Sequence, residues 1–196
     1  MGVRYYDNAV YEKIRAWVKD DRMRILKPQE SMRVFQLAAD LSDDKPITLP
    51  LISISRNTNV EILSTGKRPM SFDGLMVKSD GKKTHQINAI PIRLDYQIDI
   101  YTKEFDLGDE YVRNFVFNLI NHPKLTVTIP YNNLNYHHDC NITLGSTVQD
   151  NSDIPQRLFS GQFTRWTISF TIDDAYLFSA PIESNVSMAG DVDVEA

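Results

Sequence analysis

The feature that most constrains this fold is a change of hydrophobic period within residues 90–129, from two to 3.6 and back to two. Alternating apolar residues in Pro91–Tyr101 predict a strand whose even positions face a core and whose odd positions face water. Tyr111–Ile120 repeats its apolar residues at helical spacing, and the helix is expected to end before Pro123, which cannot continue it. Apolar residues then alternate with threonines in residues 125–129, which indicates a second strand.

The remaining segments add a helix over Tyr6–Lys19 and several short strands. The strands are expected at Met32–Leu41, Ile47–Ser55, Val60–Leu63, Phe72–Val77, Thr84–Ala89, Asn141–Val148 and Trp166–Ile172. Pro50 cannot donate a ladder hydrogen bond, so its strand is expected at a sheet edge or with a bulge. A change of apolar phase between Ala89 and Ile90 predicts a further bulge.

The alternating run that begins at Pro91 is expected to break at residues 106–109. Residues 20–29 are expected to form a charged loop, and the polar stretch around residues 131–152 a long excursion. These elements predict an α+β fold: a single sheet-dominated domain over residues 1–181 with two principal helices. Residues 182–196 carry four acids, no Lys or Arg and little apolar surface, so we expect a flexible tail that is dispensable for folding but useful for docking.

Charge is distributed unevenly over the 196 residues, whose net charge is −5. Residues 1–35 carry eight Lys or Arg against five acids, whereas no Lys or Arg follows Arg165. This polarity favours head-to-tail or partner contacts, although a solvated tail also accounts for it. The candidate partner-contact residues are Arg15, Arg22, Arg24, Asp191, Asp193 and Glu195.

Compartment signals are few. The single cysteine, Cys140, excludes an intrachain disulfide and fits a reducing compartment. The first residues lack the apolar run of a signal peptide, and no stretch approaches the roughly 20 apolar residues of a membrane helix. We therefore expect a protein made in the cytoplasm that does not enter a membrane.

No motif predicts catalysis, a metal or a cofactor. His137-His138-x-Cys140 is the only metal-like cluster, but adjacent strand residues face opposite ways and no second ligand pair has suitable spacing. Gly66-Lys67 lacks the rest of a phosphate loop, and Asp150–Asp153 lacks the glycine and glutamate of an EF-hand. Asp173-Asp174 is expected to be a turn at the end of a strand. We expect no catalytic residue and no enzyme.

One block of sequence resembles a known family. Pro91–Lys103, read as Pro-Ile-Arg-Leu-Asp-Tyr-Gln-Ile-Asp-Ile-Tyr-Thr-Lys, is similar to a strand in neck proteins of T-even-like contractile-tailed phages. These are the tail-completion, or proximal tail sheath stabiliser and connector, proteins, which are related to tail terminators. The likeness continues through Asp106–Glu110, Ile142–Leu144 and Arg165–Ile172, and upstream in Ile47–Leu51.

The resemblance implies a tail-terminator-like fold and a structural function in the virion. Such a protein forms a ring, expected to be a homohexamer, at the head-proximal end of the tail. Its partners would be other copies of itself, the tail sheath, the tail tube or terminator, and the head-tail connector, with DNA passing through the bore as cargo. A tail terminator or other head-tail connector ring remains an alternative. So does a nucleic-acid-handling protein that uses its basic N-terminal third.

Overall fold

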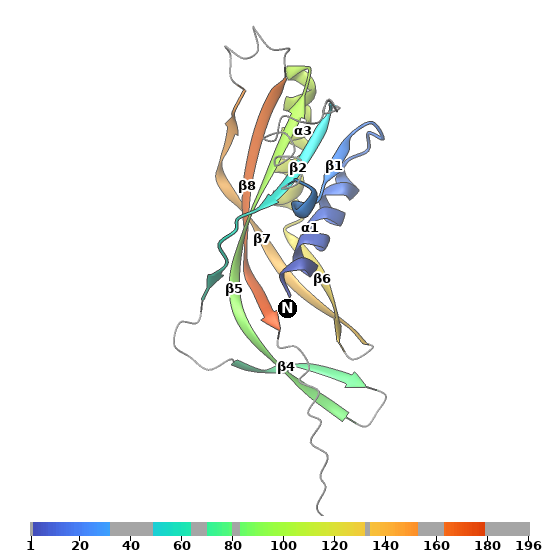
Figure 1. The fold of residues 1–196 in the computed structure, drawn as a ribbon, viewed down its shortest axis with the longest axis vertical. Helices are drawn as coiled ribbons and strands as arrows, with labels where there is room; N and C mark the ends of the chain where they lie inside the picture. The colour runs from blue at the N-terminus through green and yellow to red at the C-terminus, as the bar shows by residue number, and fades with distance from the viewer. Residues whose placement is uncertain are drawn as a thin grey trace, which may run out of the picture.

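The longest strand of the protein, β5 (Lys83–Thr102), organises the sheet. In the computed structural model, one edge of β5 pairs with β8 (Thr164–Phe178). Its other edge pairs in turn with β4 (Met70–Ser79), β3 (Glu61–Ile62) and β2 (Leu51–Arg56). All four pairings are antiparallel, and each partner on the second edge takes only part of the length of β5 (Figure 1).

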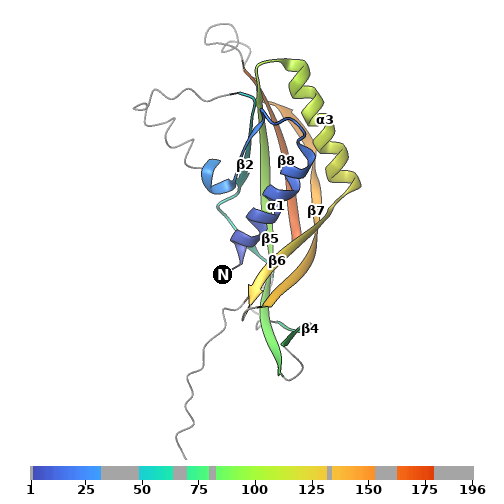
Figure 2. The same cartoon turned by 90° about the vertical axis from the view of Figure 1, so that its right-hand side faces the viewer.

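The sheet continues on both sides of this centre. β1 (Arg24–Leu26) pairs in parallel with β2, β7 (Leu134–Asp150) pairs with β8, and β6 (Lys124–Tyr131) pairs with β7. The strand order is therefore β1-β2-β5-β8-β7-β6. β7 changes partner along its length, since its second half pairs with β8 and its first half with β6. This change curls the sheet and brings β6 beside the first helix, α1 (Val3–Trp17), as Figures 1 and 2 show.

The structure describes the following residues: 2–31, 49–63, 70–79, 83–131, 134–152 and 163–178. The expected strand at Met32–Leu41 lies outside them, as do Gly66-Lys67 and the tail 182–196. Within them, the fold class predicted from the sequence is confirmed: one mixed sheet with two main helices.

Both helices, α1 and α3 (Phe105–Asn121), lie on the same side of the sheet (Figure 2). The predicted even positions of β5 all face these helices and are buried: Ile92, Leu94, Tyr96, Ile98 and Ile100. α1 contributes Tyr6, Val10 and Ile14 to the same core, and α3 contributes Phe115 and Leu119. Because burial of apolar surface is the main stabilising term in folding, this single core fixes the positions of both helices.

The alternating run ends as expected, but a few residues earlier: β5 ends at Thr102 and α3 begins at Phe105, so residues 106–109 lie inside the helix. The first turn of a helix accepts Asp106 because the exposed amide groups there attract negative charge. Glycine suits the packing at position 108, since an added Cβ would lie only 3.0 Å from Trp166 and from Thr102 Oγ1. Ile120, expected in the core, is 60% exposed instead.

The strands bring further corrections. Pro50 precedes β2 rather than lying in it, and β2 is not an edge strand because β1 pairs with it. No register shift occurs at Ala89–Ile90; the bulge between β5 and β8 lies further along, where Asp173 and Asp174 of β8 oppose Arg93 alone. These two aspartates are therefore inside a strand and do not form a turn. The Asp173 carboxylate accepts a hydrogen bond from Arg93 Nε, and the Asp174 carboxylate accepts one from the backbone N–H of Asn141 at 2.9 Å.

Two polar segments contain more structure than their composition indicated. Residues 20–29 include β1, and most of the polar stretch 131–152 is the 17-residue strand β7. Asp99, expected on a wet face, is only 2% exposed. The paired polar groups explain this burial, since Asp99 accepts from Arg165 at 3.1 Å and from Thr167 at 2.7 Å.

Candidate partner interface

The basic candidates Arg15, Arg22 and Arg24 lie between the end of α1 and β1, and all three are exposed. Arg22 is already paired, since its Nε and its terminal nitrogen donate to the two oxygens of Asp20 at 3.1 and 3.0 Å. These hydrogen bonds lower the pKa of the Asp20 carboxyl to about 2. The acidic candidates Asp191, Asp193 and Glu195 lie outside the described residues, so the structure does not bring the two sets together.

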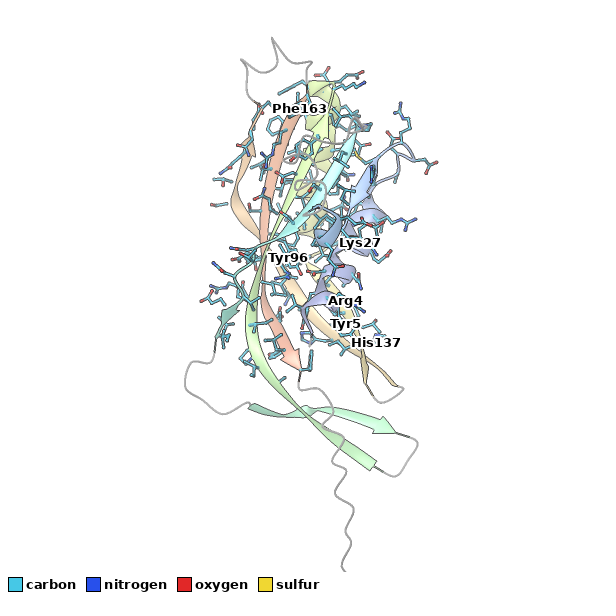
Figure 3. All side chains as sticks on the ribbon, in the orientation of Figure 1. Arg4, Tyr5, Lys27, Tyr96, His137 and Phe163 are labelled. Carbon is cyan, nitrogen blue, oxygen red and sulfur yellow. The ribbon has the colours of Figure 1, made fainter. Side chains whose placement is uncertain are left out.

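A groove between α1 and β6 is the most distinctive surface feature that the sequence did not predict. Its volume is about 530 Å³. The helix lines it with Tyr5, Asn8, Ala9, Glu12 and Lys13, and the strand lines it with Lys124, Leu125, Thr126 and Thr128. Figure 3 labels Arg4, Tyr5 and His137 near one another at the N-terminal end of α1, beside the β6–β7 ribbon. Sequence reasoning could not find this groove because its two walls lie more than a hundred residues apart.

The β6 strand presents an unpaired edge toward this groove. Ile142 N–H donates to Pro123 O at 2.8 Å, and the β6–β7 register pairs Lys124 with Asn141. Hydrogen-bonded and non-bonded pairs alternate in antiparallel sheets, so the backbone groups of Lys124, Thr126 and Thr128 point away from β7. The contact from Lys13 Nζ to Lys124 O, at 2.6 Å, agrees with this direction. Among the described residues, no strand covers this edge.

A buried ionic cluster positions the helix wall of the groove. Asp7 of α1 accepts from Arg56 Nε at 3.0 Å and from the Tyr96 hydroxyl at 2.8 Å. These contacts fasten the helix to β2 and β5. Burial, with Asp7 alongside, raises the pKa of Tyr96 well above its ordinary value, so this hydroxyl remains a donor at physiological pH. The cluster acts as a clamp on α1, because every charged member has an internal partner.

The opposite face of the sheet carries a polar trough of about 440 Å³. It is lined mainly by short polar side chains such as Ser55 and Ser169, together with Asp95, Arg56 and the rings of Tyr96 and Phe170. Gly145 also lines it and is needed there, because a Cβ would lie 2.8 Å from Ser169 O. No imidazole or amine stands among these described lining residues, so the trough does not pair a serine with the base that nucleophilic catalysis requires.

The metal-like cluster separates in space. His138 Nε2 forms a hydrogen bond to the backbone carbonyl oxygen of Asp174 at 2.9 Å. His137 is exposed, and Cys140 is buried. Burial raises the pKa of the Cys140 thiol to about 12, which keeps it protonated and unreactive at neutral pH. In the part of the chain that the structure describes, no three His, Cys, Asp or Glu side chains gather to hold a metal ion. Asp150 instead accepts from the Ser152 amide at 2.9 Å, as in an Asx turn.

Several large apolar side chains remain exposed. Phe117 and Ile120 lie one turn apart on the outer face of α3, at 61% and 60% exposure. Ile62 and Leu63 are exposed at β3, and Phe163 is exposed at the far end of the molecule from Arg4 (Figure 3). Scattered apolar residues are ordinary on a protein surface, but an adjacent pair on one helix is a reasonable contact point for another protein.

Comparisons with known proteins assign no family to this chain. No family model matches it, and no curated protein matches it either. No described helix is long and apolar enough to cross a membrane.

Proposed function

We propose that the chain is a structural protein of the phage tail neck. In this role it forms a ring at the head-proximal end of a contractile tail, caps the tube and sheath, and joins the tail to the head connector. The observation that carries the proposal is the placement of the segments that resemble the neck-protein family. Of the segment Pro91–Lys103, residues 91–102 lie on β5; Arg165–Ile172 lies on β8 beside it, and Ile142–Leu144 lies on β7, which pairs with β8.

This placement matters because the resembling residues form one contiguous framework. Upstream, Leu51 begins β2, which pairs with the same half of β5, and Asp106–Glu110 begins α3, which packs on β5 and β8. The likeness therefore supports a shared fold, from which the neck function is inferred by analogy.

The surfaces of the protein also support an assembly role. The β6 edge exposes backbone hydrogen-bonding groups, and exposed sheet edges are a liability unless another chain covers them. In a cyclic ring every heterologous contact is satisfied by a neighbouring subunit, so the assembly does not polymerise further. The buried polar clusters around Asp7 and Asp99 bind strands and helices to one another, which suits a rigid building block.

Within the neck, the sheath stabiliser and connector is the preferred role, and the tail terminator is the alternative. Both predict a ring with an open bore, and they differ in which tail component the ring contacts. Binding to purified tail sheath would favour the first role. Binding to the tube end without sheath would favour the second.

The test of the function is direct. Purified protein should form a defined ring by light scattering and negative-stain microscopy at high concentration, and the ring should bind the head-proximal end of isolated contractile tails. Genes for sheath, tube and portal beside the coding gene would agree with this result. A monomer that never caps tails, and that instead binds DNA with strong salt dependence, would contradict the proposal and favour the nucleic-acid alternative.

A further inference from the structure

The α1–β6 groove has the properties of a site that receives an added strand. Its floor carries the outward backbone groups of Lys124, Thr126 and Thr128. Peptides that add to a sheet edge gain affinity from such main-chain groups and specificity from pockets for alternate side chains. The helix wall supplies the second element, with Tyr5 and Ala9 offering apolar contact along one side of the incoming strand.

The edge admits only a short strand. Pro130 occupies the next outward position of β6 after Thr128 and has no backbone N–H to donate. At the other end, Lys13 already caps the carbonyl of Lys124. The pairing length is therefore limited to about five residues, from Lys124 to Thr128, which is an ordinary length for a strand.

The two faces of this edge have different chemistry. Leu125 and Val127 point into the core, whereas Lys124 and Thr126 are exposed on the other face. A strand added here would continue both faces, so it should alternate apolar residues with residues that complement lysine. The nearby charges are Lys13 and Glu12 on α1, and Lys124 with Asp139, which pair with each other at 2.8 Å.

One segment of this chain has that pattern. Residues 191–195 read Asp-Val-Asp-Val-Glu, a strict alternation of β-branched valines and acids over five residues. In an extended strand the valines share one face and the three acids share the other. The valines match the face of Leu125 and Val127, and the acids match the face of Lys124.

We propose that residues 191–195 of one copy add as a strand to β6 in the α1–β6 groove of a second copy. This inference rests on the proposed function and names the contact through which neighbouring subunits join. The length of chain between β8 and this segment permits it to reach a neighbouring copy. Phe178, the last residue of β8, lies beside Gly2 at the start of the same α1, with Phe178 Cδ2 only 3.7 Å from the Cβ that Gly2 lacks.

Residues 179–190 intervene before the alternating segment. Twelve residues extend over about 40 Å, which is enough to carry the segment past its own groove to the next subunit. The same contact repeated around a ring is heterologous, as cyclic assembly requires.

Complementation in the full-length chain tests this arrangement. The tail variant carries Val192→Pro and Val194→Pro, which keep length and charge but prevent strand pairing. Its control carries Val192→Ile and Val194→Ile. The groove variant carries Thr126→Pro, which removes one outward N–H, and its control is Thr126→Ala, which loses the same Thr126–Asp139 hydrogen bond but keeps the N–H.

We expect each proline variant alone to self-associate at least about tenfold more weakly than the wild type and its control, because strand addition depends on main-chain hydrogen bonds. An equimolar mixture should restore a complex that stops at one copy of each. The tail variant has the only usable groove, and the groove variant has the only usable tail. The molar mass measured by light scattering reports both the self-association of each variant and the complex formed by the mixture.

Asn8→Trp provides a second groove variant in case Thr126→Pro does not fold. Asn8 is exposed and lines the groove, so tryptophan should fill the groove without disturbing the core. If the wild type forms rings and neither the tail variant nor Asn8→Trp weakens them, the inference is wrong while the proposed function stands. If both variants are monomeric but their mixture gives no complex, the tail occupies its own groove and the second-copy assignment is wrong. Absence of any ring or tail capping by the wild type would instead contradict the proposed function.

Discussion

Two phenylalanines on α3 allow the packing of this helix to be tested with the same substitution at neighbouring positions. Phe115 is fully buried, with its ring 6.3 Å from the ring of Trp17 on α1, whereas Phe117 is 61% exposed. Removing a buried phenylalanine loses its transfer free energy and leaves a cavity, so Phe115→Ala should cost about 3–5 kcal/mol. For a chain of this size each kcal/mol lowers Tm by about 2–4 °C, so we expect a decrease of about 6–20 °C.

Phe117→Ala is the matched control, because it deletes the same atoms from the same helix without opening a cavity. Its effect on the free energy of unfolding should stay within about 0.5 kcal/mol. Thermal and urea unfolding of both variants, at concentrations where the protein is monomeric, give the comparison. Equal losses at the two positions, or no loss at Phe115, would show that the helix face is assigned wrongly.

Three further predictions concern charges and the thiol. Arg165→Ala should cost about 3–5 kcal/mol in urea unfolding because it leaves the Asp99 carboxylate buried without its cation, and adding Asp99→Asn should recover part of that loss. Native Cys140 should react with iodoacetamide at pH 8 far more slowly than the unfolded chain, as followed by mass spectrometry, since burial raises its pKa to about 12. Arg22→Ala should raise the pKa of Asp20 from about 2 toward 3.8 in an NMR titration. Since the folded-state pKa of Asp20 is lowered, its contribution to stability is present above about pH 4 and is lost as the pH falls toward 2.

The hydrophobic periodicity of the sequence predicted those strands and helices that pack one face against the core. The alternation in Pro91–Tyr101 identified a buried face, and its even positions are buried in the structure. Such periods follow from backbone geometry alone, so they can be recognised in a single sequence. The strands expected at Phe72–Val77 and Thr84–Ala89 are likewise present, in the antiparallel pair of β4 and β5.

The errors arose where distant partners decide the outcome. Asp99 looks like a solvated residue until Arg165 and Thr167 reach it from another strand. Gly108 looks like a helix breaker, but it permits α3 to approach Trp166. β7 is polar along much of its length, so only Asn141–Val148 was expected as a strand, whereas β7 extends over Leu134–Asp150. Propensity is a weak guide at such positions, since tertiary contacts override it.

The candidate interface illustrates the same limit more strongly. The alternation in residues 125–129 predicted a strand, but the sequence does not show that this strand ends the sheet or that α1 lies along its open edge. Proteins usually protect such edges with lysine, proline or a covering helix. Here the protections are partial: Lys13 and Pro130 close the two ends, and α1 stands beside the edge without covering it. An edge restricted in this way resists indiscriminate aggregation and leaves room for one short strand, which is what the proposed closed ring would require of its subunits.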